Sequence, residues 1–333
     1  MESKLIFRGF PRVCLHRLYL YFKENTMRKI KRIIKFLNKV LRSNLKNIFI
    51  IIEKHLDRQL PTVKLYSTKY GELYLIENDV MTEVINSGRS YEPHFYDLIK
   101  IILNGNDNVI DLGANIGLHS ISMARLVPQG MVYSFEPQSL SSTQLQLNAL
   151  RNNIDNIRVY NLAASNLTGF VCGMEFIDYS KSRSNIGNIK IVDKNIGDLV
   201  MTLSLDDLSL RDIAFVKIDV QGYEYLALQG MRNILMSHRP LIFLEIEEHH
   251  LVHCGTSSEQ LINFLLNMNY YLYRINTDYP CDHLAIPREK STVYDVMLLN
   301  KYKYDITKID GKSVKLTFGQ SKTVYQKAEL GEV

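Results

Sequence analysis

The stretch FVKIDVQGYEYLALQG, residues 215–230, decides the fold class of this chain. It opens with an apolar segment typical of a buried strand and continues with the residue spacing of a helix. Asp219 ends the strand segment, and Glu224 falls in the first turn of the helix. In open α/β sheets, ligands bind outside the carboxyl ends of the strands. The two carboxylates therefore predict a ligand site at the end of this strand.

Strand and helix patterns alternate along most of the chain. Strands are predicted at 108–113, 131–136, 157–163, 214–220, 241–247, 270–275 and 294–300. Helical patterns fall near 117–127, 139–153, 223–236 and 257–268. This alternation predicts a seven-stranded, mostly parallel α/β sheet with helices on both faces. The remaining segment, 165–205, is expected to be irregular and to lie over the carboxyl edge of the sheet.

The beginning of the chain has a different composition. Residues 1–60 carry 15 Lys and Arg against 4 Asp and Glu, whereas the rest of the chain carries 25 against 31. Between residues 27 and 57, apolar residues recur at helical spacing with basic residues between them, which predicts a basic amphipathic helix. Such a helix either docks its apolar face on the main domain or lies on an anionic membrane surface. Both interpretations stay open.

The pattern divides the chain into four parts. Residues 1–60 form the basic helical arm, and residues 61–80 read as a β-hairpin that leads into the main domain. The main α/β domain covers residues 81–303, and residues 304–333 form a C-terminal tail. The sequence gives no indication of the oligomeric state.

Composition narrows the location and the partners. No segment approaches the roughly 18 uncharged apolar residues of a membrane-spanning helix, and charged residues interrupt the first 26 residues, where a signal peptide needs an apolar run. The positive charge is confined to the arm, so the main domain lacks the basic character of a nucleic-acid-binding protein. We therefore expect a cytoplasmic protein without a nucleic-acid partner, with residues 27–57 as the candidate for peripheral membrane contact.

A glycine loop, VIDLGANIG at 109–117, follows the first strand of the main domain. The dinucleotide fingerprint does not fit because Asn115 stands at one of its glycine positions, and no Gly-Lys-Ser/Thr is present for a P-loop. Gly113 permits a tight turn and leaves room for a ligand against the backbone. Glu136 ends the next strand, where an acid can accept both hydroxyls of a ribose. These features together predict a nucleoside site.

This combination resembles the class I S-adenosylmethionine-dependent methyltransferases, which have a Rossmann-like fold. The resemblance implies that the glycine loop lines the methionine part of S-adenosylmethionine (SAM) and that Glu136 binds its ribose. It also places the NLAAS segment, at the end of the third strand, near the adenine. The implied cofactor-binding residues are Asp111, Gly113, Ala114, Asn115, Gly117, Glu136, Ala164 and Ser165.

Further segments narrow the resemblance to the FkbM family of methyltransferases. The matching segments are VIDLGANIG (109–117), FEPQ (135–138), LSLDDL (203–208), FVKIDVQGYEYLALQG (215–230) and IFLEIEE (242–248). Members of this family are similar to O-methyltransferases that act on hydroxyls of sugars, glycolipids, polysaccharides and polyketides. The resemblance therefore implies a small-molecule, glycan or lipid-linked hydroxyl as acceptor. The chain departs from the family at Gln221, where an acid is usual.

Four residues are candidates for chemistry at the acceptor. Asp219 can take the proton of a hydroxyl or orient it for in-line attack. Glu224 can add a hydrogen bond, or it is only a favourable acid in the first turn of a helix. Glu245 is a third strand-end acid, and His249, which follows that strand, titrates in the useful range. Lys217 projects to the same face as Asp219, which predicts an ion pair between them.

We predict no metal site, although two sets of residues keep one open as an alternative. Asp111, Asp219 and Glu245 could together hold a divalent cation that polarises a substrate oxygen. The second set, whose loose spacing is a weak match to a zinc site, is His249, His250, His253 and Cys254.

Two other functions compete with O-methylation. An amino-group methyltransferase uses the same fold and cofactor. A non-catalytic membrane-surface protein with a vestigial SAM fold is the second alternative. Intact Asp111, Gly113, Gly117 and Glu136 favour an enzyme over this last interpretation.

Overall fold

The structure is a computed structural model that describes residues 61–174, 191–192, 198–277, 281–309 and 317–318. Residues 1–60 and 61–333 form separate units, and only the second is described. The predicted basic helix at 27–57 lies outside the described residues. None of the helices in the described ranges has the length and apolar character that a membrane crossing requires.

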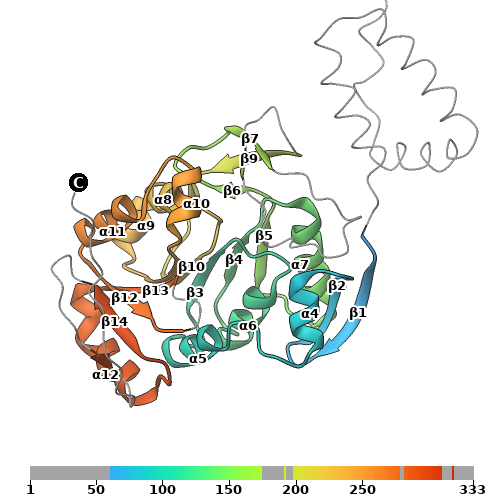
Figure 1. Ribbon diagram of the computed structural model, residues 1–333, viewed down its shortest axis with the longest axis horizontal. Helices are drawn as coiled ribbons and strands as arrows, with labels where there is room; N and C mark the ends of the chain where they lie inside the picture. Colours follow the sequence, from blue (N-terminus) through green and yellow to red (C-terminus); the bar gives the residue numbers. More distant parts are fainter. Residues whose placement is uncertain (1–60, 175–190, 193–197, 278–280, 310–316, 319–333) are drawn as a thin grey trace, which may run out of the picture. The chain divides into compact units, whose positions relative to one another are not determined.

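A mixed sheet of nine strands forms the centre of the second unit (Figure 1). Its spatial order is β15-β14-β12-β13-β11-β10-β3-β4-β5. The strands are β3 (Asn108–Leu112), β4 (Val132–Phe135), β5 (Ile157–Tyr160), β10 (Ile213–Ile218), β11 (Leu241–Glu245), β12 (Tyr270–Ile275), β13 (Asp282–Pro287), β14 (Ile306–Ile309) and β15 (Thr317–Phe318). Strands β3, β4, β5, β10 and β11 are parallel, and β12 to β15 pair antiparallel.

The parallel strands have the order of a doubly wound sheet. From β3 the chain adds β4 and β5 on one side and then returns to add β10 and β11 on the other. Strands β3 and β10 therefore pair directly, with Asp111 opposite Lys217. In such sheets the ligand site lies at this switch point, outside the carboxyl ends of the strands. The predicted Rossmann-like α/β fold is confirmed, and the sheet has nine strands rather than seven because β14 and β15 extend its edge.

The strand predicted at 294–300 is wrong, because this segment lies in helix α12 (Ser291–Lys301). An apolar run of seven residues fits a strand or a buried helix equally well. In the structure, one side of this helix is buried and another is exposed. Leu298 is buried, whereas three residues spaced three apart are exposed: Val293, Val296 and Leu299.

Strand β13, which the sequence did not predict, lies between β11 and β12 in the sheet. All six of its residues are buried. The sequence conceals this strand because Asp282 and His283 open it with polar side chains and Pro287 closes it. Proline is unusual inside a sheet but is tolerated at a strand end.

Helices cover both faces of the sheet (Figure 1). Helices α5 (Pro93–Ile102), α6 (Leu118–Leu126) and α12 pack on one face, whereas α8 (Glu224–Gln229), α9 (Arg232–Ser237) and α11 (Ser258–Asn267) pack on the other. Strand β10 joins the two cores, since Phe215 belongs to the first and Val216 and Ile218 to the second. This alternation is what the two-residue period of a strand requires.

Local sequence explains where several helices begin. Pro93 occupies the first turn of α5, where a missing N–H costs nothing. Ser257 caps α11 and accepts a hydrogen bond from the Gln260 N–H at 3.2 Å. The other helices in the described ranges are α4 (Val80–Asn86), α7 (Ser139–Arg151) and α10 (Glu248–His253), with short 3₁₀ turns at Leu205–Asp207 and Arg288–Lys290.

The lead-in forms the predicted hairpin, from β1 (Val63–Thr68) and β2 (Gly71–Ile76). Helix α7 lies against β2, where Asn148 accepts a hydrogen bond from the Tyr74 N–H at 2.6 Å. The segment 165–205 is less irregular than predicted. It contributes to a four-stranded sheet of β6 (Ala163–Ala164), β9 (Asp198–Leu203), β7 (Val171–Met174) and β8 (Ile191–Val192).

Candidate active site

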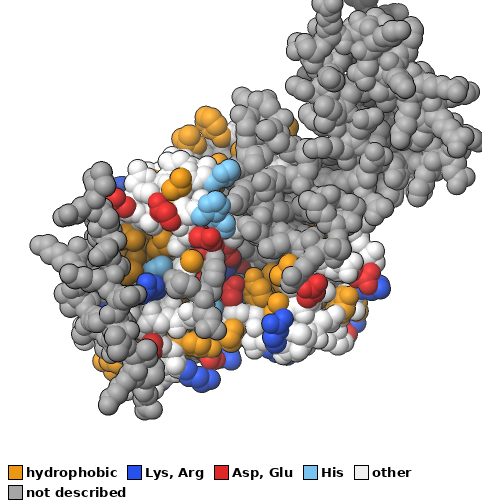
Figure 2. All heavy atoms as spheres, viewed as in Figure 1, with side chains coloured by type: hydrophobic (Ala, Val, Ile, Leu, Met, Phe, Trp, Pro, Cys, Tyr) orange, Lys and Arg blue, Asp and Glu red, His pale blue; other side chains and the backbone are white. Residues whose placement is uncertain are grey.

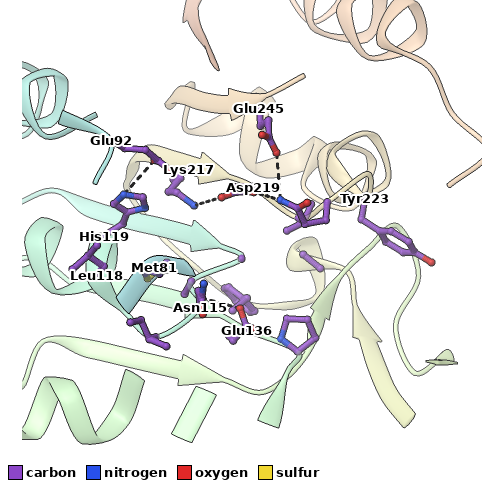
Figure 3. A pocket seen from close by; sticks show the side chains of 18 of the residues that line it. Met81, Glu92, Asn115, Leu118, His119, Glu136, Lys217, Asp219, Tyr223 and Glu245 are labelled. Carbon is purple, nitrogen blue, oxygen red and sulfur yellow. Dashed lines mark hydrogen bonds and ion pairs between the residues drawn. The ribbon is translucent and has the colours of Figure 1, made fainter. Parts of the chain in front are cut away.

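A cavity of about 480 Å³ lies at the switch point of the sheet. Its wall includes the loop after β3, the ends of β4, β10 and β11, and residues before α5 (Figure 3). This volume is within the usual range for a site that takes a small ligand. The polar side chains that line it are Tyr91, Glu92, His94, Asn115, His119, Glu136, Lys217, Asp219, Gln221, Tyr223, Glu245, Glu247, His250 and Asp282.

The glycine loop fits tightly against the end of β10. Gly113 has φ +74°, and a Cβ atom there would lie 1.7 Å from the carbonyl oxygen of Asp219. The N–H groups of Gly113 and Ala114 both donate to the Phe135 carbonyl, at 3.0 and 3.1 Å. Glycine therefore allows the loop to approach Asp219 closely.

Two of the predicted loop residues line the cavity beside Gly113, and one does not. Ala114 and Asn115 line it, and Asn115 takes a left-handed φ of 49°. Gly117 is outside the lining and begins α6 with φ +90°, where a Cβ atom would lie 2.7 Å from Leu145. Its role is to let the helix start against α7.

Glu136 lines the cavity directly beside this loop. Its Oε2 accepts a hydrogen bond from the Asn115 N–H and its Oε1 accepts one from the Gln138 N–H, both at 2.8 Å. Burial raises the pKa of Glu136 to about 7, although the two hydrogen bonds oppose the shift. Each carboxylate oxygen can accept more than one hydrogen bond, so Glu136 can still receive two hydroxyls.

A buried lysine in the cavity lining joins two of the predicted acids. The Nζ of Lys217 lies 3.4 Å from Asp219 Oδ2 and 3.6 Å from Asp111 Oδ1. Burial alone would lower the pKa of Lys217, but the charges of Asp219, Asp111 and Glu92 outweigh it and raise that pKa. The predicted ion pair between Lys217 and Asp219 is confirmed, and it keeps the lysine charged.

Asp111 does not line the cavity, in contrast to what the resemblance implied. It is fully buried and accepts a hydrogen bond from Ser120 Oγ at 2.6 Å. The side chain of a residue inside a strand points to one face of the sheet, and that of Asp111 is turned toward Lys217 and α6. Asp111 therefore holds the lysine rather than the ligand.

Asp219 and Glu245 both line the cavity, and their side chains lie near each other at the ends of neighbouring strands (Figure 3). The Nε2 of Gln221 donates to Asp219 Oδ1 at 2.9 Å and to Glu245 Oε2 at 3.5 Å. Gln221 has a left-handed φ of 52° in the turn after β10. An acid in its place could not donate, so the departure from the family pattern bridges two carboxylates that would otherwise repel each other.

Two of the four predicted catalytic residues lie outside the cavity wall. The side chain of Glu224 turns inward, where Oε1 accepts hydrogen bonds from the N–H groups of Val220 and Gly222, both at 3.1 Å. It supports the turn that carries Gln221. His249 is exposed on α10, whereas its neighbour His250 is buried and lines the cavity. Successive helical residues point about 100° apart, so only one of the two can face inward.

The structure leads to a testable prediction for Glu224→Gln. Burial raises the pKa of Glu224 from 4.5 to about 7. The folded state therefore loses stability as the pH rises from 4.5 to 7, because the unfolded chain ionises more readily. Glutamine keeps an oxygen for the two N–H donors but does not titrate. The free energy of unfolding of Glu224→Gln, relative to that of wild type, should therefore rise between pH 5 and pH 8 by an amount on the order of 1–3 kcal/mol.

Urea denaturation at the two pH values measures this difference. The exposed first-turn acid of α11, Glu259, provides the control variant Glu259→Gln, for which we expect a small difference that is equal at both pH values. If the stability difference between Glu224→Gln and wild type is the same at pH 5 and pH 8, the role assigned to the buried carboxyl of Glu224 is contradicted.

The segment before the first parallel strand supplies cavity residues that the motifs did not predict. Glu92 caps α5 with a left-handed φ of 44°, and its Oε2 lies 3.3 Å from His119 Nε2. His94 Nε2 lies 2.7 Å from Asp282 Oδ2 in a buried pair. Burial and the charge of Asp219 raise the pKa of Glu92 to about 8. The sequence signal among these residues is the segment SGRSYEP (87–93), which contains Glu92 and resembles the region before the glycine loop in the FkbM family.

Residues of β4, β6 and β7 contribute apolar side chains to the wall. Ala163 and Ala164 line the cavity together with Phe135 and Met174. Ser165 does not line it and donates instead to Asn166 Oδ1 at 3.3 Å. The predicted adenine region is therefore represented in the cavity by Ala164 and its apolar neighbours.

The two metal-ligand sets considered from the sequence do not come together. Within the described ranges, one group has ligand atoms that converge within 4.8 Å of one another, and it consists of Glu245, Glu247 and His250. The candidate metal ligands in the structure therefore differ from both sets and lie at the end of β11 and the start of α10.

Fold and site together define the class of this domain. A doubly wound sheet whose glycine loop, strand-end acid and further carboxylates surround one cavity has the architecture of a class I methyltransferase. Residues 111–272 match the model of the methyltransferase FkbM domain. The resemblance to the FkbM methyltransferases that the sequence predicted is therefore confirmed for residues 111–272. A comparison with curated protein sequences gave no match.

Several solved structures are similar at low sequence identity. The methyltransferase FkbM from Methylobacillus flagellatus KT is 19% identical with a TM-score of 0.39, over 55% of this chain and 44% of that one. This chain thus spans less than half of that protein. A putative methyltransferase from Streptococcus mutans, in complex with SAH, is 11% identical with a TM-score of 0.38, over 57% and 93%. Fibrillarin from Aeropyrum pernix, with natively bound SAM, is 13% identical with a TM-score of 0.34, over 69% and 84%.

Proposed function

We propose that this chain is a SAM-dependent methyltransferase that acts on a hydroxyl of a sugar, glycolipid or polysaccharide. One observation carries the proposal. The glycine loop contacts the end of β10 so closely that the cofactor loop and Asp219 share one cavity. A methyl donor on the loop and an acceptor at Asp219 would therefore meet in that cavity.

The described lining suits a cofactor of the size and charge of SAM. Asn115 and Gly113 would border its methionine part, and Glu136 would receive its ribose hydroxyls. Six carboxyl groups line the cavity, against one lysine among its described residues: Glu92, Glu136, Asp219, Glu245, Glu247 and Asp282. An incoming cation is attracted to such groups and lowers their pKa values. The chemistry that SAM supplies when bound is a methyl group on a positively charged sulfur.

Asp219 is the group that would accept the proton of the hydroxyl. Lys217 and Gln221 hold its two oxygens from the sides, so the carboxylate is fixed in orientation. A fixed base near the acceptor contributes to both proton transfer and alignment. The excess of carboxyl groups disfavours an acceptor that brings a phosphate or carboxylate into the cavity, and it offers hydrogen-bond acceptors to a sugar with several hydroxyls.

Location and further partners complete the proposal. We place the enzyme in the cytoplasm. Residues 27–57 are the segment that would contact an anionic membrane surface, because basic and apolar residues alternate in it. A lipid-linked sugar is an acceptor that such a location would make accessible.

Calorimetry with SAM tests the proposal directly. We expect the full chain to bind SAM with a dissociation constant in the micromolar range, and Glu136→Gln to weaken binding by about 10- to 100-fold because hydrogen bonds to a charged group are lost. The glutamine has nearly the same size, so the change in affinity reports the charge. Absence of SAM binding at millimolar concentration would contradict the proposed function.

A further inference from the structure

We propose that Glu245, Glu247 and His250 form a binding site for a divalent cation at the acceptor end of the cavity. One ligand atom from each of the three residues lies within 4.8 Å of the other two. All three residues line the cavity. The cation's role in methyl transfer rests on the proposed function, whereas its binding does not.

The chain builds this group from the junction of a strand and a helix. Glu245 ends β11, and Glu247 is the N-cap of α10. His250 follows three residues later, so it stands on the same side of the first turn, with Nδ1 3.4 Å from Glu247 Oε2. The burial of His250 and the position of Glu245 in the sheet fix two of the three ligands before any ion binds.

The donor set is suited to a catalytic metal. Two carboxylates and one imidazole give three protein ligands and leave further positions open, as in catalytic zinc sites. Ligand atoms at about 2.0–2.2 Å from a common ion lie at most about 4.4 Å apart. The observed limit of 4.8 Å therefore requires only small side-chain rotations. Carboxylate oxygens favour Mn²⁺ and Mg²⁺, and the imidazole favours Mn²⁺ or Zn²⁺ over Mg²⁺.

A second observation comes from the residue beside the group. Gln221, whose amide nitrogen lies 3.5 Å from Glu245 Oε2, has a buried side-chain oxygen without a hydrogen-bond partner among the described residues. An amide oxygen is a common ligand of divalent cations. Figure 2 shows acidic and histidine side chains gathered side by side on its visible face.

A cation at this position would solve a chemical difficulty of O-methylation. A sugar hydroxyl is a weak acid, and a carboxylate such as Asp219 is a weak base toward it. Binding of the hydroxyl oxygen to the cation lowers the pKa of that hydroxyl. Its proton passes to Asp219, its oxygen forms the new bond to the methyl carbon, and the electron pair of the broken carbon–sulfur bond stays on sulfur. The sulfonium thereby becomes a neutral thioether.

The test is titration of the metal-free full chain with Mn²⁺, followed by electron paramagnetic resonance of the free ion. We expect one site of micromolar affinity. Glu247→Gln and His250→Ala should each weaken binding at least tenfold. The adjacent residues provide matched controls, because Glu248 and His249 are exposed on the same helix. Glu248→Gln and His249→Ala should bind Mn²⁺ as wild type does.

The outcomes separate this proposal from the proposed function. SAM calorimetry on the same samples should show unchanged affinity in Glu248→Gln and His249→Ala, and the isosteric Glu247→Gln decides the question of Mn²⁺ binding if His250→Ala unfolds. Mn²⁺ binding that is absent below 1 mM, or that is equally strong in Glu247→Gln and wild type, overturns the cation site. A chain that binds Mn²⁺ at this site but does not bind SAM keeps the cation site and loses the methyltransferase.

Discussion

Replacing Asp219 by asparagine is expected to lower turnover by about 10²- to 10⁴-fold, the usual contribution of a positioned general base. Asparagine has the same shape, and its amide oxygen can still accept the hydrogen bond from Gln221 that Asp219 receives at 2.9 Å. It cannot take a proton from a hydroxyl at neutral pH. Because Asp219 lies at the acceptor side of the loop, the affinity for SAM should change by less than about threefold.

The measurement follows SAH released from SAM in the presence of a glycan and lipid extract. The extract should come from cells that lack the gene, because the unmethylated acceptor accumulates in them. Asp219→Glu serves as the matched variant, since it keeps a carboxylate and moves it by one methylene; it should retain more activity than Asp219→Asn. Equal turnover in Asp219→Asn and wild type would show that Asp219 only anchors Lys217.

The sequence predicted the site best where the fold itself determines position. Glu136 and Asp219 each follow a parallel strand and Glu245 ends one, and the carboxyl ends of parallel strands must meet at one edge of the sheet. For these residues, the position in the strand was enough. The alternation of strands and helices likewise predicted the mostly parallel sheet with helices on both faces without any knowledge of the contacts.

The prediction failed for residues whose side-chain direction changes when the position shifts by one residue along a strand or helix. Asp111 stands inside β3 and Glu224 inside α8, so their side chains point where the local period sends them, away from the cavity. His249 and His250 differ only in which side of α10 they occupy. A motif names such residues, but the direction of the side chain follows from how the helix packs on the sheet.

Other cavity residues could not be predicted because they depend on contacts between distant parts of the chain. His94 and Asp282 are 188 positions apart, and their pairing needs α5 and β13 to be placed on the sheet. The strand that carries Asp282 was itself hidden by its polar start. Sequence patterns report local periodicity, and they carry no signal for a pair of this kind.

Replacing Gly113 by alanine is expected to weaken SAM binding at least tenfold and to lower the thermal stability of the domain. The added Cβ atom would lie 1.7 Å from the Asp219 carbonyl oxygen, so the loop or the end of β10 has to move. A left-handed backbone conformation costs a residue with a Cβ atom about 1–2 kcal/mol in addition. Both the cofactor loop and the acceptor carboxylate would be displaced, so turnover should fall together with affinity.

A control variant at a second glycine distinguishes the steric clash at Gly113 from the strain of the left-handed backbone. Gly169 has φ +81°, close to the +74° of Gly113, but a Cβ atom there would meet nothing within 4 Å. Gly169→Ala should therefore lower stability only through backbone strain, which would appear as a small drop in melting temperature. It should leave the affinity for SAM unchanged. If both variants bind SAM equally well, the close approach of the loop to β10 does not shape the cofactor site. If only Gly113→Ala loses affinity, the contact between loop and strand end is what brings the cofactor to Asp219.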